Sequence, residues 1–368
     1  MGTPPDTLGD MIEATTTEAL AGRPDLKSLT RDELRAWMVE EAGEPAFRGD
    51  QVFRWLHARL ARGFDGMSDL PQALRVRLGS AARIGGLELE DVRVAGDGTR
   101  KLLLRTEDGH RIESVIIPMQ DGRLTQCVSS QVGCRIGCDF CYTARMPVRK
   151  NLAASEIADQ VLRAVEVLGE GERIGNLVYM GMGEPLDNYD QVVRSIRILL
   201  DRQGQDFASR RITVSTSGVV SRIADLGRDV PVNLAVSLNA SHDVQRSRLI
   251  PINKKWDIAQ LMAALEAFPL PPRRRITVEY VLLREVNDTP EDARRLIAML
   301  RGLRDRVKVN LIPFNPWPGA PYGRPEPASV DRFGATLRDA RFNVTIRYSK
   351  GEDIGAACGQ LDGEAVAA

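Results

Sequence analysis

The sequence predicts an α/β fold with a mainly parallel sheet. Six apolar stretches that fit strands follow one another between residues 125 and 313, and amphipathic helical stretches separate several of them. Strands separated by helices pair in parallel through right-handed crossovers. Six such units are too few for a closed eight-stranded barrel, so we expect an open sheet or an incomplete barrel. In both arrangements the reactive groups gather at the carboxyl ends of the strands.

Length and composition fit one large domain with additional segments. The chain has 368 residues, of which 43% are apolar, and this is enough for a sizeable core. Fifty basic residues balance fifty acidic residues, so the net charge does not decide whether the chain binds nucleic acid. The apolar runs are too short to span a bilayer and the first residues lack the features of a signal peptide. We therefore expect a cytoplasmic protein that does not enter a membrane.

A helical domain is predicted near the beginning of the chain. Residues 1–25 lack periodicity, and we expect them to form a mobile tail. The helical domain spans residues 26–83, where residues 28–34 supply capping side chains and apolar residues then recur at helical spacing. Basic residues such as Arg48 and Arg54 can simply solvate a helix. Composition alone therefore does not favour RNA binding by this domain.

A β-hairpin is predicted to link the helical domain to the core. Within residues 84–118, turn signals at Asp97-Gly98 and Asp108-Gly109 flank one strand, and residues 111–118 form the next. Glu113 alternates with apolar neighbours on this second strand. The pattern alone favours a solvent-facing position for its side chain.

After residue 122 strands and helices alternate. The predicted strands cover residues 125–130, 175–180, 211–215, 232–238, 276–283 and 307–313. Helices are predicted for residues 155–168, with Ser155 as the cap, and for residues 189–200, 257–267 and 289–301.

Three cysteines follow the first of these strands with the spacing C-x3-C-x2-C. Cys134, Cys138 and Cys141 offer soft sulfur ligands, which favour zinc or an iron–sulfur cluster. Structural zinc usually takes four protein ligands, and no second cysteine pair or finger-like histidine spacing is present. Three ligands are a complete set for a four-iron cluster that keeps one iron open for chemistry. The alternatives are buried thiols, or a disulfide, which the odd cysteine count disfavours.

Polar residues recur at the ends of the later strands. Gly183 and Glu184 follow the second strand, Ser215 ends the third, Ser237–Ala240 end the fourth, and Asn315 follows the sixth. Each can be explained by a tight turn or a helix cap. Their recurrence on adjacent strand ends favours a shared polar ligand.

Basic residues and two further cysteines remain. Arg246 belongs to a set of basic residues concentrated in the C-terminal half, which can form a phosphate-binding surface or merely solvate helices. Cys127 lies on the strand before the triplet. Cys358 has small, glycine-rich flanks that allow a flexible segment to enter a crowded site. Either cysteine can also be a packed thiol.

These motifs resemble a known family. The triplet is similar to the radical S-adenosylmethionine (SAM) signature, and Cys127–Cys134 with Gly181–Leu186 resembles the RlmN/Cfr family of RNA methyltransferases. The likeness runs over residues 47–361 and includes Asn310–Pro316 and Ala356–Gln360. It implies a partial (β/α)6 radical SAM barrel over residues 119–348 and a segment 349–368 that carries a methyl-accepting cysteine. Residues 26–83 would then be an RNA-binding accessory domain, joined by the hairpin 84–118.

The resemblance also implies the roles of individual residues. A [4Fe-4S] cluster would be held by Cys134, Cys138 and Cys141. SAM would be contacted by Gly183, Glu184, Ser215, Ser237, Leu238, Asn239 and Asn315. The catalytic residues would be Cys358, Cys127 and Glu113, with Glu113 as proton acceptor.

The implied mechanism uses two SAM molecules per turnover. The first methylates Cys358, and the second is reduced at the open iron to a 5′-deoxyadenosyl radical that takes hydrogen from the methyl group. The resulting methylene radical adds to adenine C2, and Cys127 then attacks the Cys358 sulfur to release the product. A transient disulfide forms in this last step.

The implied substrate is adenine 2503 of 23S ribosomal RNA, with adenine 37 of tRNA as a second substrate. An electron donor such as flavodoxin and a monomeric state are also implied. Three alternatives are a Cfr-type adenine C8 methyltransferase, an activase that installs a glycyl radical, and an RNA-binding zinc protein. The activase would not need Cys358, and the zinc protein would contain no iron.

Overall fold

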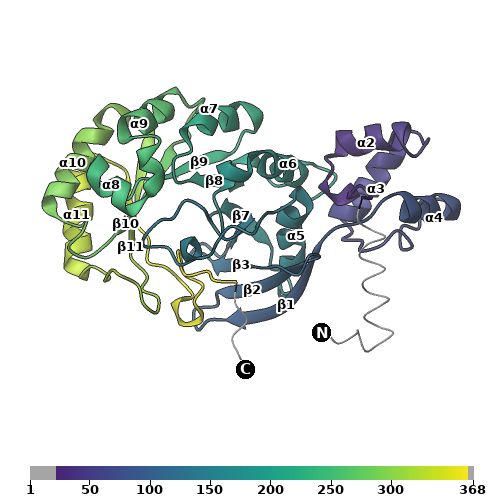
Figure 1. Ribbon diagram of the computed structural model, residues 1–368, viewed down its shortest axis with the longest axis horizontal. Coiled ribbons are helices and arrows are strands. Elements are labelled where there is room, and N and C mark those ends of the chain that lie inside the picture. The colour runs from purple at the N-terminus through teal and green to yellow at the C-terminus, as the bar shows by residue number, and fades with distance from the viewer. Residues whose placement is uncertain (1–21, 364–368) are drawn as a thin grey trace, which may run out of the picture.

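A ten-stranded mixed sheet forms the centre of the computed structural model, which describes residues 22–363 (Figure 1). The predicted tail 1–25 therefore lies almost entirely outside the described residues. In spatial order the strands are β1 (Leu87–Val94), β2 (Arg100–Thr106), β3 (Arg111–Pro118), β4 (Leu124–Cys127), β7 (Ile174–Tyr179), β8 (Ile212–Thr216), β9 (Asn233–Ser237), β10 (Ile276–Leu282), β11 (Val307–Pro313) and β12 (Val344–Ile346). A separate small sheet pairs β5 (Gln131–Val132) with β6 (Lys150–Asn151).

The sheet is parallel from β4 to β12 and antiparallel from β1 to β4. Within the described residues, β1 and β12 form its two edges and do not close on each other. The predicted α/β class and the absence of a closed barrel are confirmed. The parallel part contains one more strand than predicted, because β12 pairs with residues 309–311 of β11.

The segment predicted as a linking hairpin is part of the same sheet. It contains three strands instead of two, since β1 precedes the predicted pair. Strand β3 pairs antiparallel with β4, and Val115 lies opposite Cys127. The antiparallel strands therefore extend the parallel sheet and bring β3 beside the strand that leads to the cysteine loop.

Helices connect the parallel strands and flank the sheet (Figure 1). They are α5 (Ala154–Val165), α6 (Tyr189–Leu200), α7 (Val220–Asp229), α8 (Asp243–Leu249), α9 (Ile258–Ala267), α10 (Pro290–Leu300) and α11 (Pro327–Asp339). Short 3-10 helices cover Leu26–Ser28, Thr143–Arg145, Pro185–Asn188, Ser209–Arg211, Pro251–Lys254, Arg301–Leu303 and Glu352–Ile354. Among the helices of residues 22–363, none has the length and apolar character needed to cross a membrane.

The predicted cap of α5 is wrong. Ser155 lies inside the first turn of this helix, and the capping position is Ala153. The Glu156 carboxylate accepts a hydrogen bond from the Ala153 N–H at 2.8 Å and so satisfies an N–H that the helix itself leaves unpaired. The acidic side chain replaces the hydroxyl that the sequence pattern suggested.

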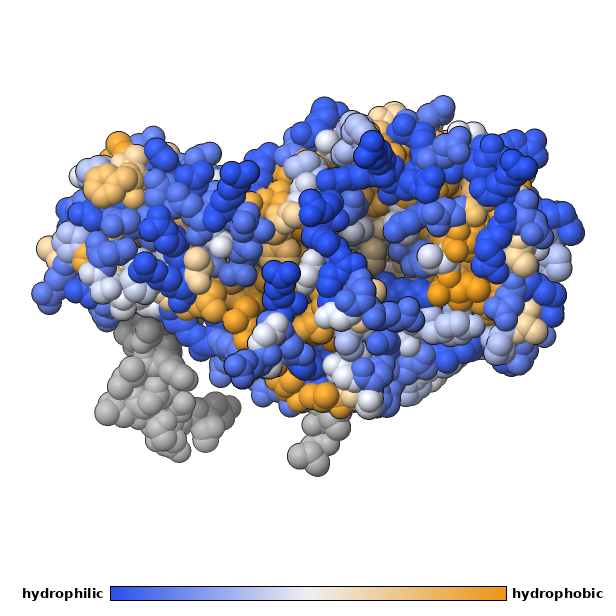
Figure 2. Space-filling model, turned by 180° about the vertical axis from the view of Figure 1, so that it is seen from behind, coloured by the Kyte–Doolittle hydropathy of each residue, from blue (hydrophilic) through white to orange (hydrophobic). Residues whose placement is uncertain are grey.

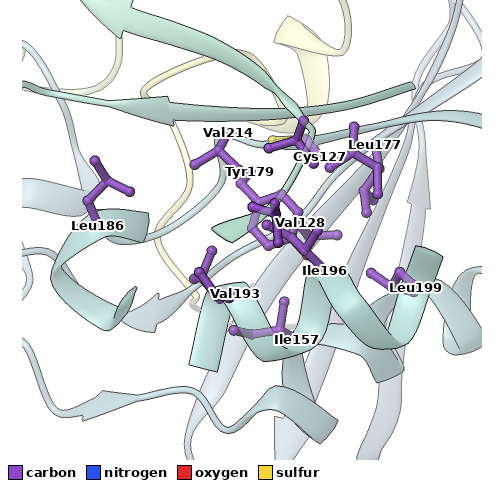
Figure 3. Packing of buried hydrophobic residues seen from close by; sticks show 14 of the residues in the cluster. Cys127, Val128, Ile157, Leu177, Tyr179, Leu186, Val193, Ile196, Leu199 and Val214 are labelled. Carbon is purple, nitrogen blue, oxygen red and sulfur yellow. The ribbon is translucent and has the colours of Figure 1, made fainter. Parts of the chain in front are cut away.

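Helices α5 and α6 pack their apolar faces on the parallel strands. Ile157 of α5 and Ile196 of α6 belong to the same buried apolar cluster as Leu177 and Tyr179 of β7 (Figure 3). The Tyr179 hydroxyl is hydrogen-bonded to Ser195 at 2.9 Å, so its polar atom is satisfied within the core. This packing fixes the strands whose carboxyl ends carry the candidate site.

A small helical unit lies at one end of the molecule (Figure 1). It consists of α2 (Arg31–Glu40), α3 (Phe47–His57) and α4 (Gln72–Ala81). Thr30 and Glu33 form a capping box at the start of α2, as the sequence predicts. The buried apolar residues of the unit belong to the same core cluster as those of the sheet. Figure 2 shows hydrophobic side chains on the rear face where the unit meets the rest of the molecule.

A buried ion pair also connects the helical unit to the sheet region. The Lys27 ammonium lies 2.5 Å from the Asp159 carboxylate of α5, and the two side chains are 2% and 1% exposed. Asp159 also accepts a hydrogen bond from the Leu87 N–H at 2.7 Å and pairs with Arg163. Burial raises the pKa of Asp159, whereas the Lys27 charge lowers it. The ammonium therefore stabilises a carboxylate that cannot reach water.

We predict that Lys27→Met lowers the free energy of unfolding of the apo protein by about 3 kcal/mol, because the Asp159 charge stays buried without its main partner. Urea denaturation followed by circular dichroism measures the change. The exposed pair Arg77–Glu44 serves as control, and Arg77→Met should cost less than about 1 kcal/mol. Equal effects of the two substitutions would show that the buried pair contributes no more than a surface pair.

Candidate active site

A cavity lies at the carboxyl ends of the parallel strands. Its wall is formed by residues at the ends of β4, β7, β8, β9 and β10, by the cysteine loop and by the C-terminal segment. All five cysteines of the chain line this cavity: Cys127, Cys134, Cys138, Cys141 and Cys358. None of them forms a disulfide bond in the described residues. The fold thus gathers thiols from distant parts of the sequence at the edge where reactive groups are expected.

The cysteine triplet lies on the loop between β5 and the 3-10 helix Thr143–Arg145. Within the loop, the Cys141 N–H donates to the Cys138 carbonyl at 3.1 Å. Gly133 begins the loop with a φ of 80°, and a Cβ atom there would collide with the carbonyl oxygen of Pro147. Only glycine fits this position without a shift of the backbone.

Glu184 is a buried carboxylate in the loop after β7. One of its oxygens accepts hydrogen bonds from the Ser217 N–H at 2.7 Å and the Ser217 hydroxyl at 2.6 Å, and the other accepts from the Leu186 N–H at 3.0 Å. Burial raises the pKa of Glu184, while these hydrogen bonds lower it. Glu184 also lines the cavity, where its carboxylate can meet a donor group of a ligand.

Gly183 allows the Glu184 loop to approach β5. Its φ is 97°, and a Cβ atom would lie 2.6 Å from the Cβ of Gln131. The Gln131 side chain in turn accepts a hydrogen bond from the Glu184 N–H at 2.9 Å. A larger residue at position 183 would push the carboxylate away from this position.

Arg246 of α8 holds the strand ends beside Glu184. Its guanidinium donates to the carbonyl oxygens of Ser217 at 2.6 Å, Ser237 at 3.1 Å and Leu238 at 3.2 Å, and to the Asn253 side chain at 3.0 Å. The side chain is fully buried, and burial lowers its pKa to about 10. The expectation that Arg246 belongs to a phosphate-binding surface is therefore wrong.

The residues expected to contact SAM lie in two environments. Five of them line the cavity: Gly183, Glu184, Ser215, Ser237 and Asn239. Leu238 does not, because its side chain is fully buried in the core and its carbonyl bonds to Arg246. Asn315 does not line the cavity either. Its side-chain amide donates to the Cys358 carbonyl at 3.1 Å and to the Ser349 hydroxyl at 2.8 Å.

The C-terminal segment is attached to the cysteine loop. The Tyr142 N–H donates to the Gly359 carbonyl at 2.8 Å, and the Thr143 hydroxyl donates to the Leu361 carbonyl at 2.7 Å. Together with Asn315, these bonds hold Cys358 at the side of the cavity that is open to solvent. Cys127, at the end of β4, lines the same cavity and is buried.

Burial and the charge of Arg347 affect the pKa of both thiols outside the triplet, Cys127 and Cys358. Burial raises the pKa of Cys127 to about 12. Cys358 reaches water but is surrounded by the cavity wall, and this desolvation raises its pKa to about 11. The positive charge of Arg347, which also lines the cavity, lowers both values. Each thiol is therefore neutral at ordinary pH unless a further group stabilises its thiolate.

Comparison with known proteins identifies relatives over nearly the whole chain. Residues 128–297 match the model of the radical SAM superfamily, and residues 24–84 match that of the ribosomal RNA large subunit methyltransferase N-terminal domain. A dual-specificity RNA methyltransferase RlmN from Syntrophotalea carbinolica is 47% identical over 93% of this chain and 90% of its own length. The chain belongs to the RlmN family. It is thus related to radical SAM RNA methyltransferases and is itself a transferase of this class.

Further relatives agree with the assignment to the RlmN family. The RlmN of Syntrophobacter fumaroxidans is 46% identical, with coverage of 92% of this chain and 98% of the relative. The crystal structure of a radical SAM methyltransferase from Sphaerobacter thermophilus superposes with a TM-score of 0.85. It is 44% identical and covers 93% of this chain and 100% of its own. The fold described above is therefore that of a solved radical SAM methyltransferase.

The cysteine triplet fits the cluster that an RlmN family member requires. In residues 22–363 no three histidine, cysteine, aspartate or glutamate side chains are grouped to hold one metal ion. A four-iron cluster is larger and takes one thiolate on each of three irons. Cys134, Cys138 and Cys141 border one cavity, and a charge on Cys134 or Cys141 disfavours ionisation of Cys138. These three thiols would hold the cluster, and bound iron would stabilise the thiolates that burial disfavours.

Glu113 is not exposed to solvent, contrary to the expectation from its strand pattern. The residue is 1% exposed, and its carboxylate pairs with the Lys101 ammonium at 2.7 Å and accepts from the Asp362 N–H at 2.9 Å. Burial raises the pKa of Glu113, and the Lys101 charge lowers it. Glu113 does not line the cavity, and its hydrogen bond with the Asp362 N–H places its carboxylate against the C-terminal segment.

Three residues of the cavity were missed by sequence reasoning. Ser217, which holds Glu184, lies two positions after Ser215 in a run of hydroxyl residues that already indicated a polar strand end. Glu279 lies in the otherwise apolar strand β10, and a carboxyl in such a strand is a usable signal. Arg347 follows β12, a strand too short to stand out from the sequence.

We predict that iodoacetamide alkylates Cys127 of the folded, cluster-free protein at least about a hundredfold more slowly at pH 8 than an ordinary thiol. Because its pKa is raised to about 12, the thiolate fraction should grow about tenfold with each pH unit up to pH 10. Peptide mass spectrometry measures the rate. The protein unfolded in urea is the control, and a rate in the folded protein that levels off below pH 9 would contradict the prediction.

Proposed function

We propose that the chain methylates C2 of adenine in the peptidyl-transferase region of 23S ribosomal RNA, with adenine 37 of tRNA as a second substrate. The observation that carries the proposal is that all five cysteines line one cavity. Three suffice for a cluster with an open iron, which leaves Cys127 and Cys358 for covalent chemistry. The relatives' description as dual-specificity RNA methyltransferases supports an RNA substrate.

A protein-bound carbon carrier has a chemical reason. C2 of adenine is an electron-poor carbon and is not nucleophilic enough to take a methyl group from SAM directly. When bound, the cluster and two SAM molecules supply the methyl group and the radical that activates it. Cys358 loses its thiol proton and carries the methyl carbon on sulfur. Its position at the solvent-open side of the cavity allows a base of a large RNA to reach it.

Cys127 then releases the product. Its thiolate attacks the sulfur of Cys358, so that an S–S bond forms while the bond between that sulfur and the transferred carbon breaks. The electron pair of the broken bond goes to the carbon side, and the carbon takes up a proton to become the methyl group of the product. Both thiols line the same cavity, and a charge on Cys358 raises the pKa of Cys127. Reduction of the transient disulfide returns the enzyme to its starting state.

We assign Glu113 as the acceptor of the proton lost from C2. Both of its oxygens have partners, one from Lys101 and one from the backbone of Asp362. Asp362 belongs to the segment that carries Cys358, so a movement of this segment during the reaction would expose the carboxylate. The raised pKa of Glu113 makes it a stronger base than an ordinary carboxylate.

The helical unit of residues 26–83 is proposed to contact the RNA. Phe47 is 52% exposed, and the Arg48 guanidinium lies 4.9 Å from its ring centre. Arg59 lies similarly over Trp55 at 4.3 Å. The exposed Phe47 ring and the partly buried Trp55 ring each lie next to a guanidinium group, a combination that suits unpaired bases and phosphates. The unit is followed by the sheet 84–118 and the barrel 119–348, and the carrier segment 349–368 completes the proposed domain division.

We propose that the protein acts in the cytoplasm as a monomer and receives electrons from a donor such as flavodoxin. A reduced cytoplasmic environment keeps all five cysteines available as thiols.

We predict that anaerobically reconstituted protein transfers label from methyl-labelled SAM to protein-free 23S ribosomal RNA, and that nucleoside analysis finds 2-methyladenosine. Formation of 8-methyladenosine instead would assign the Cfr-type reaction. Colourless protein that contains zinc and no iron would contradict the radical mechanism altogether.

Two cysteine variants separate the carrier from the releasing thiol. Cys358→Ala should lower methylation by at least about 10³-fold, since no sulfur remains to carry the carbon. Cys127→Ala should instead accumulate RNA covalently attached to Cys358, detectable as a protein–RNA band and by peptide mass spectrometry. Both variants should bind iron like the wild type, because neither residue belongs to the triplet. Full methylation by Cys358→Ala would exclude the carrier role.

A further inference from the structure

Glu279 is a buried carboxyl on the cavity wall to which the mechanism above gives no role. It lies on β10, is 7% exposed, and lines the same cavity as Cys127 and Cys358. In the sheet register it lies between Ser237 of β9 and Asn310 of β11. Placing a carboxyl in the middle of a buried parallel strand is costly unless the group has partners.

Two neighbouring side chains orient the Glu279 carboxyl. The Asn310 amide donates to one Glu279 oxygen at 2.6 Å, and the carbonyl oxygen of the same side chain accepts from the Thr345 hydroxyl at 2.8 Å. Because Thr345 bonds to the Asn310 oxygen, the NH2 group of Asn310 faces Glu279. One carboxyl oxygen is thereby fixed, and the other is available to the cavity.

Arg347 complements Glu279 on the same wall. It follows β12, where its backbone N–H donates to the Leu311 carbonyl at 2.8 Å, and its side chain lines the cavity. Its charge favours the ionised form of Glu279, although burial raises the pKa of that carboxyl. The wall therefore presents both an acceptor and a cationic donor to the cavity.

An adenine base offers the matching pattern along one edge. The exocyclic N6 amino group donates and the adjacent ring nitrogen N7 accepts, and C2 lies at the opposite side of the purine. A base bound through N6 and N7 would therefore present C2 away from the wall. Glu279 and Cys358 line the same cavity, so C2 would face the space that the Cys358 sulfur borders.

We propose that Glu279 accepts a hydrogen bond from N6 and Arg347 donates one to N7 of the target adenine, which makes the site selective for a base with a 6-amino group. This inference rests on the proposed function and names two base-contacting residues for it. SAM also contains adenine, but the expected SAM contacts that line the cavity end or follow β7, β8 and β9, whereas Glu279 lies on β10 and Arg347 follows β12. Cys358 is held by Asn315, which follows β11, so it belongs to the same part of the strand order as Glu279 and Arg347. We therefore assign the contact to the RNA base.

The substitution Glu279→Gln gives a sharp test. Asn310 presents its NH2 group, so the glutamine would direct its carbonyl oxygen to Asn310 and its own NH2 group into the cavity. An NH2 group repels the 6-amino group of adenine, whereas it donates a hydrogen bond to the 6-oxo group of hypoxanthine. Both bases keep N7, so Arg347→Gln should weaken both to a similar extent.

The experiment uses the reconstituted full-length protein and two otherwise identical 23S ribosomal RNA fragments, with adenosine or inosine at the target position. The wild type should prefer the adenosine RNA in kcat/KM and in the dissociation constant by about tenfold or more. Glu279→Gln should lose or reverse this preference. Glu291→Gln, an exposed residue of α10, is the matched control and should keep the wild-type ratio.

Separate outcomes test the inference and the proposed function. Equilibrium dialysis with labelled SAM should give the same dissociation constant for wild type and Glu279→Gln within about twofold. If Glu279→Gln keeps the wild-type ratio of kcat/KM for adenosine RNA to kcat/KM for inosine RNA, the inference is overturned. If that ratio is unchanged and SAM binds more weakly, the carboxyl instead contacts the adenine of SAM. If Glu279→Gln fails to fold by thermal melting, Thr345→Val, which releases the Asn310 amide, should reduce the ratio. A wild type that forms no 2-methyladenosine on the adenosine RNA would instead contradict the proposed function.

Discussion

The arrangement of the active site depends on one buried guanidinium. Arg246 binds the carbonyl oxygens at the ends of β8 and β9, and the same end of β8 supplies the Ser217 hydroxyl that holds Glu184. The carbonyl oxygens at the ends of parallel strands have no partner within the sheet, and a buried carbonyl without a hydrogen bond is costly. One side chain from α8 satisfies three of them. The polar wall of the cavity therefore follows from a structural requirement of the sheet edge.

Local sequence patterns predicted most of the elements but few of the long-range contacts. The helix Tyr189–Leu200 and the position of the cysteine triplet were predictable, because periodicity and ligand spacing are local. Strand β12 was not, since three residues of moderate apolarity acquire strand structure only by pairing with β11. The burial of Arg246 depends on carbonyl oxygens at two strand ends that only the folded sheet brings together, and that of Glu113 depends on the backbone of Asp362; local pattern favoured solvent for both. The family resemblance supplied the role of Glu113, which its strand position did not.

The candidate site combines residues of different mobility. The residues expected to contact SAM lie mostly on strand ends that the sheet and Arg246 hold rigidly. Cys358 is carried by a glycine-containing segment whose bonds to Tyr142, Thr143 and Asn315 are individual hydrogen bonds at its edge. A single such bond contributes only about 1 kcal/mol. In the proposed mechanism, the strand ends would hold the cofactor while the more weakly attached segment carries carbon from one partner to another.

The proposed carrier cysteine is separate in sequence from the sheet that forms the cavity. The last strand of the sheet ends at residue 346, and Cys358 follows twelve positions later. The cysteine triplet, the strand ends and Arg246 all precede it. Changes in the segment around Cys358 can therefore alter the proposed carbon carrier without removing a strand, so this segment can vary while the framework of the cavity stays the same.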